Sequence, residues 1–113
     1  MSSVLTKKDW KSTVRCALTA TQIIAKLVDQ PGWLLDGDGK DLAIQKTFHF
    51  THYLETMSFV NAVAFIAERY DHHPELLVKY SSCRVRFNTH DVSGISVTDF
   101  DCASEVDALV KVR

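Results

Sequence analysis

The order of elements along this sequence predicts an α+β fold, in which helices pack on one face of an antiparallel or mixed sheet. Segments with helical periodicity alternate with pairs of short segments whose apolar residues recur at every second position. The predicted order is helix-strand-strand-helix-strand-strand-helix, and hairpins separated by helices are typical of α+β proteins. The sheet face without helices must be solvated or buried by another subunit.

Composition limits the possible classes of protein. With 113 residues, 46% hydrophobic and 24% charged, the chain is expected to form one compact domain. The net charge of −1 and the scattered basic residues argue against direct nucleic-acid binding. No apolar run approaches the roughly 20 residues of a membrane span, so no membrane partner is expected.

The cysteines and the N-terminus indicate the compartment and the domain limits. Cys16, Cys83 and Cys102 are odd in number and none form a C-x-x-C motif, which argues against a disulfide scaffold and a cysteine-rich zinc site. The first residues lack the apolar stretch of a secretory signal. We expect a cytoplasmic protein, with a nuclear location also open. Residues 1–17 are predicted to be an N-terminal extension, with Trp10 and Val14 as candidate anchors, and residues 18–113 the domain.

The first half of the domain contains one helix and one hairpin. Thr19 and Gln22 match a capping box that starts the helix, and Pro31-Gly32 ends it. A strand at Trp33–Leu35 precedes Asp36-Gly-Asp-Gly39, where Asp-Gly predicts a tight turn. The return strand is predicted over Leu42–Phe50. Its one irregularity is Lys46, which falls on the apolar face and is expected to extend its ammonium group towards water at an edge.

The second half repeats this pattern. A long helix is predicted over Thr51–Tyr70, ended by Pro74, with a wide apolar stripe made of two rows. Those rows are Leu54, Met57, Val60, Ala64 and Ala67, and beside them Phe59, Val63, Ile66 and Tyr70. Strands are predicted over Leu76–Tyr80 and Cys83–Thr89, although Ser81-Ser82 is a poor hairpin turn by composition. Ser96 is expected to cap the last helix, with Asp99 at its third position.

Three of the five histidines lie where the predicted elements meet. Adjacent His72 and His73 follow the long helix, and His90 follows the last strand. If the two intervening strands form a hairpin, the chain returns His90 towards this pair. Glu68 lies four residues before His72, so the two share a helix face if the helix extends that far. His49 and His52 are expected on the solvated strand face and in the first helical turn.

Spacing alone leaves three interpretations of the histidines open. Clustered imidazoles suit proton transfer near neutral pH. Alternatively, His72, His73 and Pro74 form an ordinary helix end, where the helix dipole favours histidine. A metal site is the third interpretation, although adjacent histidines seldom chelate one ion and no carboxylate has a standard ligand spacing. A nucleophile is not indicated, since the chain has no G-x-S-x-G motif and no glycine-rich phosphate loop.

The spacing of the chemical residues resembles that of a known family. The pattern is Glu68-x-x-x-His72-His73-Pro74, five residues, Tyr80, nine residues, His90, eight residues and Asp99. It is similar to the pattern of the pterin-4a-carbinolamine dehydratases. The resemblance extends upstream to Gly32-Trp33, Ala43-Ile44, Lys46 and Phe48-His49-Phe50, and downstream to Thr89-His90-Asp91 and Gly94-Ile95-Ser96. It covers about Thr19 to Val110. Asp101 stands where some members carry tryptophan.

The resemblance implies an activity and an assembly. Members remove water from 4a-hydroxytetrahydropterin to give quinonoid dihydropterin, which regenerates the pterin cofactor of aromatic amino-acid hydroxylases. It implies a four-stranded antiparallel sheet with helices on one face, a homodimer or homotetramer, and no metal or organic cofactor. An alternative role is also implied, because some members act as dimerisation cofactors of a transcription factor by docking a helix. The outer face of the helix predicted at Thr51–Tyr70 would then accept the partner.

The chemistry of dehydration suggests roles for the matching residues. The leaving hydroxide needs a proton and a ring nitrogen must lose one, and histidine can do either. His72 and His90 are therefore predicted to be the catalytic acid–base groups, while His73, also within the catalytic set, would hold the pterin ring or its hydroxyl. Glu68 and Asp99 are predicted to orient the imidazoles or to bind the amino and amide edge of the ring.

Overall fold

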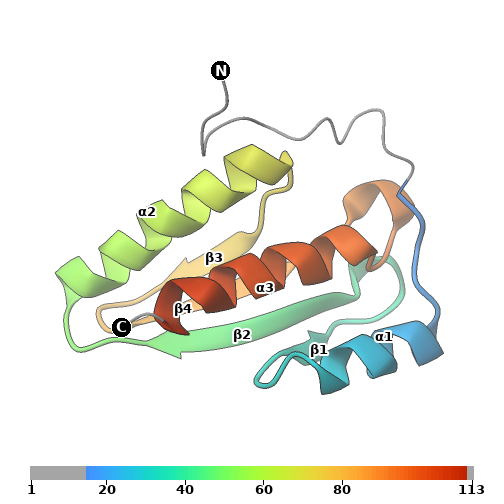
Figure 1. The fold of residues 1–113 in the computed structure, drawn as a ribbon, viewed down its shortest axis with the longest axis horizontal. Helices are drawn as coiled ribbons and strands as arrows, with labels where there is room; N and C mark the ends of the chain where they lie inside the picture. The colour runs from blue at the N-terminus through green and yellow to red at the C-terminus, as the bar shows by residue number, and fades with distance from the viewer. Residues whose placement is uncertain (1–14, 112–113) are drawn as a thin grey trace.

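A computed structural model describes residues 15–111, and its four strands form one antiparallel sheet with the helices on one face (Figure 1). The α+β prediction is confirmed. The elements are α1 (Ala20–Val28), β1 (Leu34–Asp36), β2 (Ala43–His49), α2 (Tyr53–Tyr70), β3 (Glu75–Val78), β4 (Ser82–Phe87) and α3 (Val97–Lys111). Trp10 and Val14, with the rest of residues 1–14, lie outside the described part. Within residues 15–111, no helix has both the length and the apolarity to cross a bilayer.

The sheet has the strand order β1-β2-β4-β3, and every neighbouring pair is antiparallel. Its central pair, β2 and β4, aligns Ile44 with Phe87 and Phe48 with Cys83. In β4 the buried residues alternate strictly with half-buried arginines, because successive side chains of a strand point to opposite faces. The helix-covered face contains the core. The core includes Trp33, Ile44, Phe48, Phe59, Val63, Ile66, Val85, Phe87, Phe100 and Val106.

The caps of α1 and α2 come from the residues just before each helix. At α1, the Thr19 side chain accepts from the Gln22 amide, while the Gln22 side chain accepts from the Thr19 amide, as a capping box requires. At α2, the ring of His52 accepts a hydrogen bond from the Glu55 amide at 3.2 Å. His52 is therefore the cap of α2 and does not lie in its first turn, where the sequence placed it.

The two predicted apolar rows of α2 are not equally buried. The buried residues are Thr56, Phe59, Val63, Ile66 and Ala67. Leu54, from the other predicted row, is 73% exposed, and Phe65 is 58% exposed. The predicted apolar stripe is therefore buried mainly along its Phe59 row. Of the other row, Ala67 is buried and Val60 packs partly against the core, while Leu54 stays in contact with solvent.

The β1–β2 connection occupies residues 37–42, against the 36–41 left between the predicted strands. β1 ends at Asp36 and β2 begins at Ala43, with a short 3-10 turn over Gly39–Asp41. Arg86 donates to the Asp41 carbonyl at 2.7 Å, and Asn88 donates to the Leu42 carbonyl. Side chains from the distant strand end thus stabilise a loop that the local Asp-Gly signal could not specify.

Lys46 is anchored inside the fold. Its ammonium group donates to Asp107 at 2.8 Å and to the Pro31 carbonyl at 3.2 Å, and Trp33 donates to the second oxygen of Asp107. Gly32 has φ of 89°, a backbone conformation that favours glycine, and a Cβ there would also lie 2.9 Å from the flexible end of the Lys46 side chain. The lysine that interrupts the alternation of β2 therefore links β2 to α3.

Candidate functional site

His72 is turned into the protein by the way α2 ends. The helix stops at Tyr70, and Asp71 adopts a left-handed conformation with φ of 50°. The His72 amide then donates to the Ala67 carbonyl at 3.0 Å, which closes the helix end. Pro74 precedes β3, so the chain cannot continue as a helix. As a result His72 is buried, with 6% of its surface exposed.

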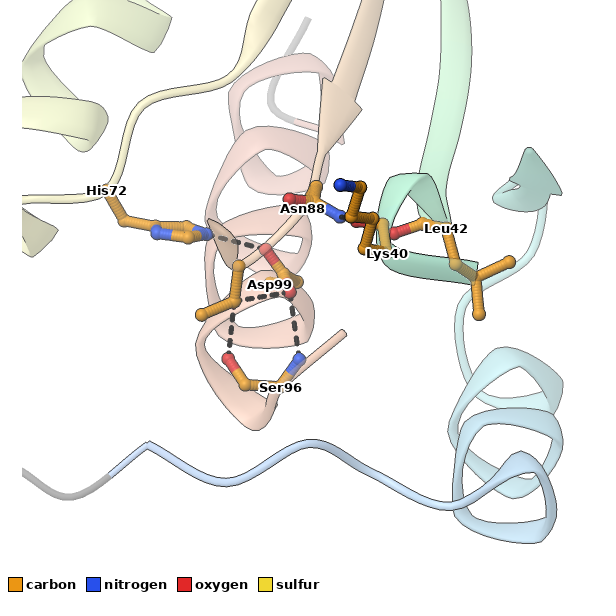
Figure 2. Close-up of polar contacts among 7 residues, drawn as sticks. Lys40, Leu42, His72, Asn88, Ser96 and Asp99 are labelled. Carbon is orange, nitrogen blue, oxygen red and sulfur yellow. Dashed lines mark hydrogen bonds and ion pairs between the residues drawn. The ribbon is translucent and has the colours of Figure 1, made fainter. Parts of the chain in front are cut away.

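The ring of His72 is held on its edge and on one face. Its Nε2 atom lies 2.5 Å from Oδ1 of Asp99, which is fully buried at the start of α3 (Figure 2). The ring also stacks on Phe87, with centroids 6.0 Å apart and planes inclined by 10°. These two contacts fix the orientation of the imidazole and leave Nδ1 as its remaining polar atom.

Asp99 is held by three donors. Its Oδ2 atom accepts from the Ser96 amide at 2.9 Å (Figure 2). The same oxygen accepts from the Thr89 hydroxyl at 2.7 Å. Both bonds use Oδ2 as an acceptor, as expected of a carboxylate. An ionised carboxylate only accepts, so Nε2 of His72 must donate to it. The neutral imidazole of His72 is therefore protonated at Nε2 and has its lone pair at Nδ1.

His73 forms a second, exposed pair. Its Nε2 atom lies 2.9 Å from a carboxylate oxygen of Glu68, with the two side chains 58% and 63% exposed. The sequence placed Glu68 and His72 on one helix face, conditional on the helix extending to His72. Because α2 ends at Tyr70 and Asp71 reverses the backbone, Glu68 contacts His73 instead. Each adjacent histidine therefore has its own carboxylate, one buried and one at the surface.

His90 begins a short 3-10 turn after β4 and is exposed. The predicted hairpin of β3 and β4 is present, with the Lys79 amide donating to the Ser82 carbonyl at 2.8 Å. Within residues 15–111, the His90 ring makes no hydrogen bond or ion pair to His72 or His73. The link is through its neighbour Thr89, whose hydroxyl contacts Asp99.

Tyr80, which the family pattern includes, lies at the opposite end of the β3–β4 hairpin. It is 65% exposed, stacks on Tyr53, and its carbonyl accepts from the Thr56 hydroxyl. Its position separates it from the end of the sheet where His72 and Asp99 meet. We therefore attribute the fixed position of Tyr80 in the family pattern to the shape of the β3–β4 hairpin.

Two residues of the site were not assigned a role from the sequence. In the sequence, Phe87 is an ordinary apolar residue of an alternating strand, and its neighbours in the chain give no sign that His72 stacks on it. Thr89 is a buried threonine directly before His90, ten residues before Asp99. A polar residue at the end of a buried strand, next to a histidine, is the signal that could have singled it out.

No other described feature competes with this cluster. Within residues 15–111, no group of three or more histidine, cysteine or acidic side chains is arranged to hold a metal ion. One hollow of about 270 Å³ is lined by residues such as Gln30, Lys46 and Asp107, and one of about 260 Å³ lies beside Arg84 on β4. The three histidines line neither, and the chemical residues gather instead around Asp99.

Comparisons with known proteins agree with this architecture. The family model described as pterin 4 alpha carbinolamine dehydratase matches residues 16–109. A relative from Paracidovorax citrulli, which has the provisional name pterin-4-alpha-carbinolamine dehydratase, is 59% identical over 109 residues, covering 96% of this chain and 94% of its own. A similarly named protein from Stenotrophomonas maltophilia is 51% identical over 89 residues, covering 78% and 75%.

Solved structures show the same fold. A protein from Brucella melitensis described as a transcriptional coactivator/pterin dehydratase superposes with a TM-score of 0.77 at 28% identity, covering 82% of this chain and 97% of that one. A pterin dehydratase-like protein described as a RuBisCO assembly factor superposes with a TM-score of 0.59 at 23% identity, which shows the fold alone.

Proposed function

This chain belongs to the pterin 4 alpha carbinolamine dehydratase family, and on that premise we propose that it performs the dehydration by histidine acid–base catalysis around Asp99. The activity itself, loss of water from a pterin carbinolamine, makes it a carbon–oxygen lyase. The observation that carries the proposed mechanism is the buried pair of His72 and Asp99, which fixes one imidazole in a single orientation and tautomer.

The proposed reaction needs one acid and one base. The bond between C4a and the hydroxyl oxygen breaks, the leaving hydroxide takes a proton to become water, and a ring nitrogen releases a proton. No electrons are gained or lost overall, and the product is quinonoid dihydropterin. A positioned acid or base typically contributes about 10²–10⁴-fold to such a step.

His72 is the better supported of the two proposed acid–base residues, His72 and His90. Its Nε2 proton is committed to Asp99, so Nδ1 is the atom that exchanges a proton with the substrate. When Nδ1 takes up a proton, the buried Asp99 carboxylate stabilises the resulting imidazolium cation. The aspartate of a Ser-His-Asp triad orients and supports its catalytic histidine in the same way. Only a small part of the ring is exposed, which suits contact through one atom.

His90 is the proposed partner in proton transfer. It is exposed and directly follows Thr89, whose hydroxyl is bound to Asp99, so its backbone is fixed to the His72 network. His73 is proposed to hold the pterin ring or its hydroxyl. Glu68 orients the His73 ring, or binds the amino and amide edge of the pterin. We propose no metal or organic cofactor.

We further propose a homodimer or homotetramer. The sheet face opposite the helices presents Arg84, Arg86 and Leu77, and the exposed apolar residues of α2 lie on another surface. A symmetric second copy could bury either surface. Light scattering after gel filtration measures the mass, and a monomer at micromolar concentration would contradict the proposal.

A binding role for α2 is the second candidate. Leu54 and Phe65 are exposed on this helix, where an apolar partner helix could dock. The Brucella structure is described as a coactivator as well as a dehydratase. Replacing both residues by glutamine, followed by a dehydration assay and a pull-down with a candidate helix, separates the roles. A binding role predicts lost capture with an unchanged dehydration rate.

The test of the catalytic proposal is a dehydration assay on freshly generated 4a-hydroxytetrahydropterin. His72→Ala and His90→Ala are each expected to reduce turnover by at least about tenfold. His49→Ala is the matched control, because His49 is an exposed histidine on β2. Circular dichroism checks that each variant is folded. Wild-type rates in both site variants would refute the assignment, and so would a dihydropterin bound elsewhere in a soaked crystal.

A further inference from the structure

Thr89 occupies a buried position between the histidines. Its side chain is fully buried two residues after the end of β4, and the next residue is His90. Its hydroxyl lies 2.7 Å from Oδ2 of Asp99, the carboxylate whose other oxygen binds His72. Thr89 and His72 therefore bind opposite oxygens of the Asp99 carboxylate.

The direction of the hydrogen bonds around Thr89 follows from its single proton. The ionised Asp99 can only accept, so the Thr89 hydroxyl donates to it. Thr89 also lies 2.6 Å from the Ser96 hydroxyl, and because its own proton is used, Ser96 must be the donor there. The result is a chain of bonds from Ser96 to Thr89 to Asp99, with His72 donating to the far oxygen.

The backbone of Thr89 fixes the loop that carries His90. The Thr89 amide donates to the Gly94 carbonyl at 2.8 Å, and the Val92 amide donates to the Thr89 carbonyl at 3.1 Å. Ser93 takes a left-handed conformation with φ of 53°, which brings the chain back to Gly94. Thr89 therefore contacts both the base of the His90 loop, through its backbone, and the carboxylate of Asp99, through its side chain.

We propose that Thr89 is a positioning residue that acts through Asp99, holding the carboxylate in the rotamer that keeps His72 protonated at Nε2 with Nδ1 free for the substrate. This inference rests on the proposed catalytic function. Without the hydroxyl, Asp99 loses one of two donors on Oδ2 and can turn away from His72. Threonine suits the position because its branched Cβ restricts χ1, which aims the hydroxyl at Asp99.

The variants that test this proposal differ by one hydroxyl. Thr89→Val keeps the shape and removes the donor, and Thr89→Ser keeps the donor. The matched control is Thr56→Val, because Thr56 is a fully buried threonine whose hydroxyl is bound to the Tyr80 carbonyl far from Asp99. Thr89→Val loses the bonds of its hydroxyl to Asp99 and Ser96, and Thr56→Val loses those to the Tyr80 and His52 carbonyls, so both should unfold at a lower temperature.

The expected results separate positioning from stability. Thr89→Val should lower kcat by about tenfold, the lower end of the effect of losing a supporting hydrogen bond, with KM changed by less than about twofold. Thr89→Ser and Thr56→Val should keep kcat near the wild-type value. In the Asp99→Asn background, Thr89→Val should cause little further loss, because residues that act as a unit are not additive.

A second measurement does not depend on activity. The ¹⁵N chemical shifts of the His72 imidazole report which nitrogen is protonated. Thr89→Val should change them from one tautomer to a mixture, and Thr56→Val should not. If Thr89→Val does not fold, Ser96→Ala replaces it, since it removes the hydroxyl that donates to Thr89 and should cause a smaller change of the same sign.

Two outcomes would overturn the role of Thr89: wild-type kcat in Thr89→Val, or unchanged His72 shifts in that variant. An inactive wild-type protein would instead refute the proposed function, and the imidazole shifts would still test the inference. The two failures are therefore distinguishable.

Discussion

His72 and Asp99 are joined through Nε2 and Oδ1 at 2.5 Å, and both side chains are buried at the point where α2, β4 and α3 meet. The remaining oxygen of Asp99 is occupied by the Ser96 amide and the Thr89 hydroxyl. Because the carboxylate is also fully buried, it presents no surface to a pterin in this arrangement. Of the two roles considered for Asp99, orienting His72 fits the contacts.

Asp99→Asn tests that role directly. Asparagine has one oxygen where aspartate has two. If its NH₂ group faces His72, the imidazole must change tautomer to accept from it; if the NH₂ group faces Ser96 and Thr89, those two donors lose their acceptor. We expect kcat to fall by about 10²-fold or more, while KM changes little, because the ring has lost its catalytic form. Steady-state kinetics on generated carbinolamine measure both parameters.

Asp107→Asn is the matched control for this substitution. Asp107 is also a buried aspartate of α3, two turns after Asp99, but it binds Trp33 and Lys46. It should lower the melting temperature while leaving kcat per folded molecule unchanged. Equal losses of kcat in the two variants would mean that the effect is structural, and Asp99 would have no special role.

The elements of this fold were predictable from local signals. The capping box at Thr19 and the proline after α2 each act over a few residues, and both lie where the sequence placed them. The conformation of the β1–β2 connection was not predictable, because Arg86 and Asn88 reach it from a strand far along the chain. Interactions over such distances leave no periodic signal.

The site was predictable as a set of residues but not as a set of contacts. The sequence left Glu68 and Asp99 as equivalent candidates to orient the imidazoles. Their division depends on the left-handed backbone of Asp71, which points His72 inward and leaves His73 beside Glu68. An aspartate in that conformation is not evident from sequence alone, so the pairing needed the structure.

Glu68→Gln separates the two roles open for Glu68. Its bond to His73 is exposed, and exposed ion pairs contribute about 0–1 kcal/mol, so the melting temperature should hardly change. If Glu68 binds the amino and amide edge of the pterin, KM should rise by about tenfold with kcat retained. A reduced kcat at constant KM would point instead to orientation of His73.

Lys46→Met should destabilise the protein without affecting the chemistry. The lysine is bound to buried Asp107, and its removal leaves that carboxylate with only the Trp33 donor. Leaving a buried polar group without its partner costs about 1–3 kcal/mol, and more when the group is charged. Glu105→Gln, which breaks the more exposed pair with Arg69, should cost less than about 1 kcal/mol. Urea unfolding measures both, and equal midpoints would contradict the expectation.

The thiols give a prediction about pH. Burial, with a contribution from nearby Asp99, raises the pKa of the Cys102 thiol far above its ordinary value of 9.0, and burial raises the pKa of Cys83 as well. Cys16 is exposed. A disulfide reagent at pH 8 should therefore modify Cys16 quickly, and Cys83 and Cys102 only after unfolding, because the thiolate is the reactive form.

The raised pKa of the Cys102 thiol also makes the stability of the protein depend on pH in the alkaline range. Above pH 9 the Cys102 thiol ionises in the unfolded chain while the folded protein keeps it protonated, so the folded state binds more protons and the free energy of unfolding falls as pH rises. The limiting slope is about 1.4 kcal/mol per pH unit for this thiol, and it is absent below pH 8. Urea unfolding from pH 7 to 10.5 measures it.

Cys102→Ala, less stable at neutral pH because of its cavity, should lose less further stability over this interval than the wild type. Parallel pH profiles for the two proteins would show that Cys102 is not the source of the alkaline loss.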